Sequence, residues 1–176
     1  MATATEMLRN VVLLSHSHAG KTSLAEALLA SGGAVSKLGK IADGTTLLDF
    51  DPEEIKRKIS INTSTASYMY KEHKINLIDT PGYFDFAGEA YEGISAADGA
   101  LILVSAKSGV SAGTELAFER AEKAGLPIIV FINKMDDERA NYKKVLEQLK
   151  EKFGRRIAPF RVPITEGGTL TGYVNI

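Results

Sequence analysis

Three short runs of consecutive apolar residues stand out along the chain: Val11 to Leu14, Ala100 to Val104, and Ile128 to Ile132. Runs of this length that are rich in Val and Ile are typical of strands buried on both faces, as in a parallel sheet covered by helices. Ile59 to Tyr70 is richer in Thr, Ser and Tyr. It predicts a strand with one exposed face, and Lys74 to Asp79 is the expected hairpin partner.

Helical patterns lie between these strands, and their ends carry residues that favour helix termini. Thr22 to Ala30 is rich in Leu and Ala, and a later helix is expected to end near Ala124, just before Gly125. Asn141 can cap a helix from Tyr142 to Phe153, whose apolar residues fall on one stripe. Strands that alternate with helices predict an open, doubly wound α/β fold.

The segment between Gly32 and Ser60 matches neither pattern, because it is polar and irregular. Within it, Asp51 can cap a short helix that has Pro52 in its first turn and Glu54 three residues after the cap. A connection of this length in a compact domain is usually either functional or disordered.

Composition narrows the class of protein. The 176 residues are enough for one globular domain. Lys and Arg number 21 and Asp and Glu 22, so the net charge of −1 gives no electrostatic signal for nucleic-acid binding. The chain has no Cys, no basic-then-apolar leader pattern and no apolar run of membrane-spanning length. We expect a cytoplasmic protein without membrane contacts.

The eight residues from Ser15 to Thr22, Ser-His-Ser-His-Ala-Gly-Lys-Thr, follow an apolar strand and open a helix. This context predicts a phosphate-binding loop, in which backbone N–H groups and the helix N-terminus face an anion. Lys21 would reach the β- and γ-phosphates, and the Thr22 hydroxyl would ligate Mg²⁺. The loop has Ser15 where the general pattern has Gly, so a turn with a chance Lys-Thr is the alternative. The expected nucleotide-binding residues here are His18, Ala19, Gly20, Lys21, Thr22 and Ser23.

Two of the chain's three histidines lie in this loop. We interpret His16 as a packing or hydrogen-bonding residue, and the side chain of His18 as facing solvent, rather than either as a catalytic group.

Asn133, Lys134 and Asp136 follow the apolar run that ends at Ile132. A carboxylate at such a strand end can accept both donors on the Watson–Crick edge of guanine, and adenine offers no such pair. A surface turn would also explain the four residues if they stood alone. Their position about a hundred residues after a phosphate loop favours a base-reading role, and it argues against an ATPase or a P-loop kinase.

Asp79-Thr80-Pro81-Gly82 follows a predicted strand. Asp79 is placed to hold Mg²⁺ through water, and Gly82 lets the backbone approach the γ-phosphate closely. An ordinary Pro-Gly turn is the alternative. The following helix, expected from about Phe86 to Ala97, contains two glycines that weaken it, which suits a segment ordered by the γ-phosphate.

Taken together, these motifs resemble those of the translation GTPases, most closely the G domain of elongation factor G or an elongation factor G-like paralogue. The resemblance also includes Arg57-Lys58-Ile59-Ser60-Ile61. It implies a Ras-like P-loop NTPase fold with a mostly parallel sheet, GTP or GDP and Mg²⁺ as ligands, and the ribosome as partner. Ser60 matches a Thr that ligates Mg²⁺ in the family, alongside Thr22 and Asp79.

The chain departs from the family at three positions near the phosphates. Tyr83 stands where the family has a His that positions the attacking water, His18 replaces an Asp, and Lys58 replaces a Gly. The catalytic residues that the resemblance implies are therefore Lys21 and Gly82, with Tyr83 at the position of that His. A phenol cannot become a cation near neutral pH.

The family also has a Ser-Ala loop after its last sheet strand, and we interpret Ser105-Ala106-Lys107, which lies upstream, as a coincidental match. By this resemblance, residues 1–158 form an incomplete GTP-binding domain and residues 159–176 begin an inserted subdomain. We expect the last strand and helix of the domain to be missing. An uncovered strand edge recruits other strands, so Arg161 to Ile164 or Tyr173 to Ile176 is predicted to fold onto the edge beside Ile128 to Asn133, unless a neighbouring molecule covers it.

Two functions follow from the resemblance. The first is GTP hydrolysis by in-line attack of water, which the ribosome would stimulate in the parent protein. The second is a nucleotide-sensing module with negligible turnover.

Overall fold

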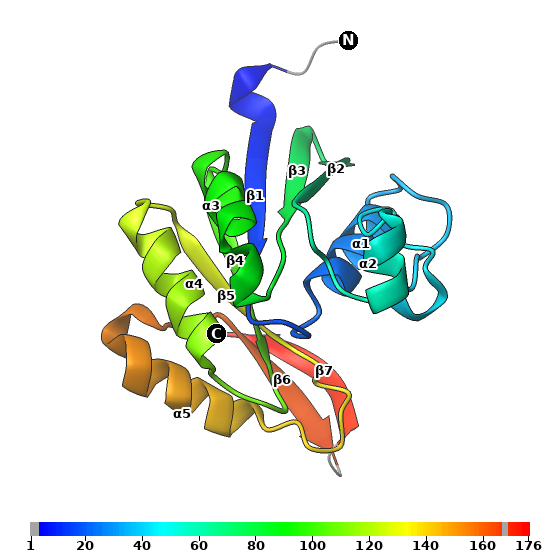
Figure 1. Cartoon of the computed structure of the whole chain (residues 1–176). Helices are drawn as coiled ribbons and strands as arrows, with labels where there is room; N and C mark the ends of the chain where they lie inside the picture. The colour runs from blue at the N-terminus through cyan, green and yellow to red at the C-terminus, as the bar shows by residue number, and fades with distance from the viewer. Residues whose placement is uncertain (1–3, 167–168) are drawn as a thin grey trace.

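The central feature of the computed structural model, which describes residues 4–166 and 169–176, is a five-stranded sheet in the order β2-β3-β1-β4-β5 (Figure 1). Strand β1 is parallel to β3 and β4, β4 is parallel to β5, and β2 is antiparallel to β3. The mostly parallel α/β sheet predicted from the sequence is therefore confirmed. The strands are β1 (Leu8–Leu14), β2 (Ser64–Tyr70), β3 (His73–Asp79), β4 (Gly99–Ser105) and β5 (Ile128–Asn133).

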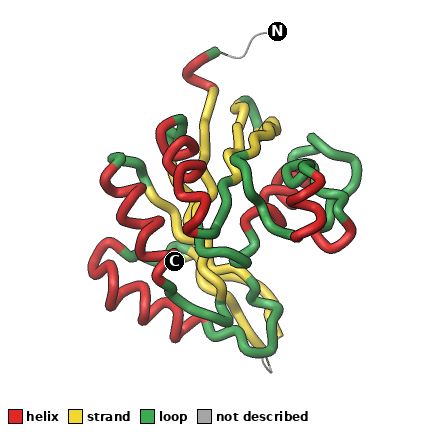
Figure 2. The backbone as a smooth tube through the Cα atoms, in the orientation of Figure 1, coloured by secondary structure: helices red, strands yellow, loops and turns green. Residues whose placement is uncertain are grey.

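Helices cover both faces of this sheet (Figure 2). The α-helices are α1 (Lys21–Ser31), α2 (Pro52–Arg57), α3 (Ala87–Ser95), α4 (Ala112–Lys123) and α5 (Tyr142–Phe153). Short 3₁₀ turns occur at Thr5–Met7, Ile41–Asp43, Phe84–Phe86 and Gly154–Arg156. Among the described residues, no helix is long and apolar enough to cross a membrane.

The side-chain alternation of β1 divides the core into two layers. Val12 and Leu14 pack with the buried residues of α3, α4 and α5, whereas Leu13 packs with those of α1 on the opposite face. All three side chains are buried. Removal of large apolar side chains from water on both faces is the dominant favourable term for such a sheet, and it explains why the second half of β1, Val11 to Leu14, is continuously apolar.

Strand β5 differs from this pattern, so the prediction that it is buried on both faces is wrong. Ile128, Val130 and Ile132 pack against the layer that contains α3, α4 and α5. The alternate residues Ile129 and Phe131 are 53% and 39% exposed. The reason is that β5 is the edge strand of the sheet, and α1 covers the other face only as far as the central strands.

The C-terminal part of the described chain forms a separate two-stranded sheet. Strands β6 (Arg161–Glu166) and β7 (Thr169–Asn175) pair with each other in antiparallel orientation, and neither belongs to the five-stranded sheet. The prediction that one of them pairs with the edge of β5 is therefore wrong. Pairing of segments close in sequence costs less loop-closure entropy than pairing with a distant strand, which favours the hairpin. The hairpin still contributes Pro163 and Tyr173 to an apolar groove beside β5 of about 740 Å³.

The predicted strand from Ile59 to Tyr70 is shorter than expected, since β2 begins only at Ser64. Glu54 explains the difference. Its carboxylate accepts the backbone N–H groups of Ile61 and Asn62, at 2.9 and 3.0 Å, so these donors are not free to join the sheet.

The short helix predicted from Asp51, Pro52 and Glu54 is confirmed as α2. The Asp51 side chain accepts the N–H of Glu53, and the Glu54 side chain accepts the N–H of Asp51, which together form a capping box. The Glu54 side chain is only 1% exposed, although the helix lies within a long surface connection. One buried carboxylate thus joins the start of α2 to the segment that follows its end.

We expect Glu54→Ala to lower the free energy of unfolding by about 2–3 kcal/mol, because three backbone N–H groups lose a charged acceptor. Glu53→Ala is the matched control. Glu53 is the neighbouring residue, and its ion pair with Arg57 is exposed, so this change should cost less than about 1 kcal/mol. Urea denaturation of the variants measures the difference, and equal losses would contradict the role assigned to Glu54.

Candidate functional site

The loop between β1 and α1 is the centre of the candidate site. Two of its residues have left-handed backbone conformations, His18 with φ 60° and Gly20 with φ 98°. A Cβ atom added at Gly20 would lie 2.5 Å from the Asn133 side-chain nitrogen. Glycine at this position therefore allows both the backbone conformation and the close contact with the end of β5.

Lys21 is the first residue of α1, and its side chain is 6% exposed. Its ammonium group donates a hydrogen bond of 3.0 Å to the Ser15 hydroxyl. Burial lowers the pKa of Lys21, while the nearby carboxylates of Asp79 and Asp49 raise it. This buried cation lies at a helix N-terminus, and its hydrogen-bond partner is a neutral hydroxyl. Such an arrangement can bind an anionic ligand.

Three hydroxyl and carboxylate groups meet next to this lysine. The Thr22 hydroxyl donates to Asp79 Oδ2 at 2.6 Å and lies 3.1 Å from the Ser60 hydroxyl. The other oxygen of Asp79, Oδ1, is buried and has no partner within the described part of the chain. Mg²⁺ prefers such oxygen ligands, and an unpaired buried carboxylate oxygen fits a site that a cation or its water would complete.

Asp49 belongs to the same cluster, although no sequence pattern singled it out. The Ser60 hydroxyl donates to Asp49 Oδ1 at 2.7 Å, and Asp49 is 4% exposed. Burial raises the pKa of Asp49, whereas the hydrogen bond from Ser60 lowers it. Asp49 lies in the irregular connection after α1, and its place depends on the adjacent Leu48, which is buried in the layer beneath α1. No local sequence pattern predicts that packing.

Gly82 lies directly against the phosphate loop. A Cβ atom added there would be 2.7 Å from both the Lys21 ammonium nitrogen and the Ser17 backbone nitrogen. Any side chain at this position would collide with the loop. The structure thus brings the segment after β3 against the loop between β1 and α1.

His18 and Tyr83 form a contact that the sequence did not predict. The His18 Nε2 atom and the Tyr83 hydroxyl lie 2.8 Å apart, with the rings edge to face. The interpretation of the His18 side chain as simply facing solvent is therefore incomplete, because it is exposed but bonded. His16 packs against the Phe84 ring at a centroid distance of 5.7 Å, which agrees with its interpretation as a packing residue.

Most of these groups line one pocket of about 210 Å³, and the buried Asp79 carboxylate lies behind this lining, bonded to Thr22. Its walls come from the phosphate loop, the segment around Ser60, the segment after β3, and the end of β5. The lining residues are Ser17, His18, Gly20, Lys21, Thr22, Ser23, Ile41, Asp49, Lys58, Ile59, Ser60, Gly82, Tyr83 and Lys134.

The expected base-reading residues differ in where they lie relative to this pocket. Asn133 donates a hydrogen bond of 2.9 Å to the Ala19 carbonyl, which joins β5 to the phosphate loop. Lys134, with φ 60°, lines the pocket. Asp136 is exposed and does not line it. The pocket therefore contains the phosphate side of the predicted site, and Asp136 lies further along the turn.

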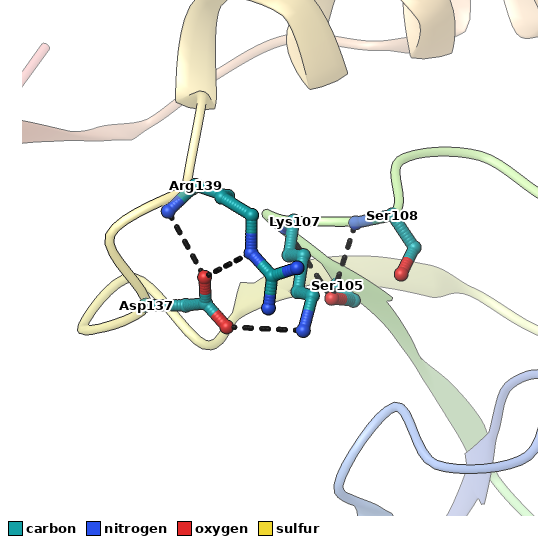
Figure 3. Close-up of polar contacts among 5 residues, drawn as sticks. All are labelled: Ser105, Lys107, Ser108, Asp137 and Arg139. Carbon is teal, nitrogen blue, oxygen red and sulfur yellow. Dashed lines mark hydrogen bonds and ion pairs between the residues drawn. The ribbon is translucent and has the colours of Figure 1, made fainter.

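The turn that carries Asp136 is held by its neighbour, Asp137 (Figure 3). Asp137 accepts the Arg139 backbone N–H at 2.9 Å and forms ion pairs with Arg139 and with Lys107. The backbone N–H of Arg139 is the main reason that the pKa of Asp137 falls to about 2. The backbone N–H groups of Lys107 and Ser108 donate to the Ser105 hydroxyl, which holds the loop after β4. The ion pair of the Lys107 side chain with Asp137 then joins this loop to the one after β5. Sequence reasoning missed this role, since two adjacent aspartates carry no sign of which one is structural.

Comparison with known proteins adds independent information. The family model described as the elongation factor Tu GTP binding domain matches residues 6–173. An elongation factor G-like protein of Mycobacterium tuberculosis is 41% identical over 160 residues, which is 91% of this chain and 22% of that protein. The mitochondrial ribosome-releasing factor 2 of Culex quinquefasciatus is 36% identical over 169 residues, 96% of this chain and 23% of that protein.

Among solved structures, the crystal structure of a protein from Thermus thermophilus superimposes with a TM-score of 0.91 at 40% sequence identity. The match covers 96% of this chain and 25% of that chain. The chain thus spans about a quarter of the length of the relatives it matches.

The buried carboxyl group of Asp79 predicts a pH effect. Its pKa is raised to about 6, mainly by burial, while Lys21 and Thr22 act in the opposite direction. A group whose folded-state pKa is raised stabilises the folded state below the unfolded pKa, and this contribution is lost as pH rises through the folded value. Without metal or nucleotide, we expect the free energy of unfolding to fall between about pH 4 and pH 6.

Urea denaturation in EDTA across this range measures the effect. Asp79→Asn cannot titrate, so its curve should lack the part of the slope that Asp79 contributes. Identical slopes for the two proteins would contradict the assignment.

Proposed function

The chain belongs to the family of the elongation factor Tu GTP-binding domain, as a G domain of the translation GTPases, and we propose from this premise that its pocket binds GTP and GDP together with Mg²⁺. The observation that carries the proposal is the buried Lys21 ammonium, which stands at the start of α1 and faces a pocket lined by the phosphate loop. A charged phosphate would give this cation the partner that the Ser15 hydroxyl replaces only in part.

The hydroxyl and carboxylate cluster supports the metal part of the proposal. Thr22 and Ser60 would ligate Mg²⁺, and Asp79 would hold it through water. Bound there, Mg²⁺ would neutralise charge on the β- and γ-phosphate oxygens. The unpaired Oδ1 of Asp79 is the atom that best fits this role, since a buried carboxylate oxygen without a partner is otherwise costly.

We assign guanine selectivity to the turn after β5. Asn133 would hold the phosphate loop and the base site at a fixed distance through its bond to Ala19. Asp136 would accept the two donors of the guanine edge. Its exposed carboxylate is free to do so, because Asp137 provides the contacts that fix the turn.

GTP hydrolysis is the reaction that we propose for the parent protein. Lys21 would stabilise the charge that develops on the phosphates, and the N–H of Gly82 would donate to the γ-phosphate. One relative is named as a ribosome-releasing factor, which supports the ribosome as partner. We also propose the cytoplasm as location, residues 1–158 as the GTP-binding unit and residues 159–176 as the start of an inserted subdomain.

One observation favours a second candidate function, a nucleotide-sensing switch with negligible turnover. Tyr83 lines the pocket, at the position where the family has a His, and its phenol cannot carry a positive charge near neutral pH. GTP turnover measured with and without ribosomes distinguishes the two functions, because only the first predicts ribosome-stimulated release of phosphate.

We expect Lys21→Ala to weaken GDP binding about ten- to a hundredfold, which corresponds to the loss of one charge-assisted contact of roughly 1.5–3 kcal/mol. Calorimetry in the presence of Mg²⁺ measures this change. Lys74→Ala, on β3 outside the pocket, is the control and should bind as the unchanged chain does. Unchanged GDP affinity in Lys21→Ala would refute the phosphate-site assignment.

Asp136→Asn should shift the preference from guanine toward xanthine nucleotides, because an amide can donate to the xanthine carbonyl where a carboxylate can only accept. The ratio of GDP to XDP affinities is the measurement. Asp137→Asn is the matched control, since it should disturb the turn without this exchange of preference. If Asp136→Asn retains the original ratio, Asp136 does not read the base.

A further inference from the structure

The contact between His18 and Tyr83 joins two segments that are 65 residues apart in sequence. His18 belongs to the phosphate loop, and Tyr83 belongs to the segment that follows β3. Both side chains line the pocket that also contains Lys21. The 2.8 Å bond therefore closes a link across the edge of the phosphate site rather than at a distance from it.

The position of this link determines what it holds in place. Tyr83 is the residue directly after Gly82, whose backbone lies against Ser17 and Lys21. In the described part of the chain, the N–H of Gly82 has no hydrogen-bond acceptor. His18 directly precedes Ala19, which is buried and whose carbonyl accepts a hydrogen bond of 2.9 Å from the Asn133 side chain. One end of the link is thus anchored, and the other end sets the distance between Gly82 and the phosphate loop.

The distance between Gly82 and the phosphate loop should affect binding of the terminal phosphate more than binding of the rest of the nucleotide. The backbone of the phosphate loop reaches the phosphates that GDP and GTP share. Under the proposed function Lys21 reaches the β- and γ-phosphates, and Gly82, whose backbone lies against Lys21, is the donor assigned to the γ-phosphate. A donor that is already held in position binds more strongly, since less conformational freedom is lost on binding.

We propose that the hydrogen bond between His18 and Tyr83 is a specificity element for the terminal phosphate, which holds the N–H of Gly82 where it can donate to a γ-phosphate oxygen. This inference rests on the proposed function. It makes His18 and Tyr83 positioning residues for triphosphate recognition, acting as one unit through their shared bond. Loss of either partner releases the same segment, so the two losses are not additive.

Two conservative variants remove the bond with little other change. Tyr83→Phe deletes the hydroxyl and retains the ring. His18→Asn deletes the imidazole, and asparagine tolerates the left-handed backbone conformation. The chain offers matched controls in Tyr70→Phe and His73→Gln, which lie opposite each other at the turn of the β2–β3 hairpin, outside the pocket.

The measurement is the dissociation constant for GDP and for a non-hydrolysable GTP analogue, by calorimetry with Mg²⁺, together with a thermal melt of every variant. We expect the ratio of the analogue constant to the GDP constant to rise about three- to tenfold in each single variant, the range for one hydrogen bond. The double variant should resemble either single one, and the controls should retain the original ratio.

An unchanged ratio in Tyr83→Phe would overturn the inference, as would a lower ratio, which would mean that the bond obstructs the triphosphate. Additive effects in the double variant would overturn it as well, because they would show that the two side chains act separately. If the unchanged chain binds neither nucleotide, the proposed function fails and the inference fails with it. If it binds both and only the ratio test fails, the proposed function stands.

Discussion

The structure depends on a lysine ammonium that is buried where the phosphate loop turns into α1. A cation in this place is costly unless negative groups surround it, and the chain brings Asp79 from β3 and Asp49 from the connection after α1 toward Lys21. Those carboxylates are in turn held by the hydroxyls of Thr22 and Ser60. The mutual constraint of one cation and two anions explains why three segments that are distant in sequence converge on one pocket.

Buried carboxylates also organise the long connection between α1 and β2, but there they accept backbone N–H groups instead of pairing with cations. Glu26 of α1 accepts the N–H of Leu47 at 2.6 Å, and Glu54 accepts those of Ile61 and Asn62. Both glutamates are 1% exposed. An irregular segment obtains in this way the backbone hydrogen bonds that a helix or sheet would otherwise supply. The parts of this connection that lie outside α2 and the 3₁₀ turn at Ile41–Asp43 are held in this way.

Most of the fold could be predicted from the sequence because its signals are local, whereas the errors concern positions that depend on distant contacts. The apolar runs predicted β1 and β4 correctly, and the cap formed by Asp51 predicted α2. The exposed face of β5 follows from its place at the edge of the sheet, and the shortened β2 follows from the bonds to Glu54. No local sequence pattern predicts the exposed face of β5 or the late start of β2.

The same division holds for the candidate site. Its glycines and Lys21 belong to short motifs whose spacing is fixed by backbone geometry, and the structure brings them together. Asp49 and the bond between His18 and Tyr83 could not be found in this way, because each needs the folded position of a second segment. Tyr83 and His18 depart from the family in residue type, but their contact exists only when both segments are in their folded positions.

Lys58 ends α2 in the left-handed region, at φ 57°, immediately before the residues that carry Ser60 to the pocket. A non-glycine residue is less stable in this conformation by about 1–2 kcal/mol. The free-energy difference that favours the ordered arrangement of residues 58–63 over its alternatives is therefore smaller than it would be with glycine at position 58. A ligand that contacts only the ordered arrangement must supply more of the free energy that maintains it, and the segment leaves that arrangement more readily once the ligand departs. The resting population of this segment is thus set partly by a single backbone angle.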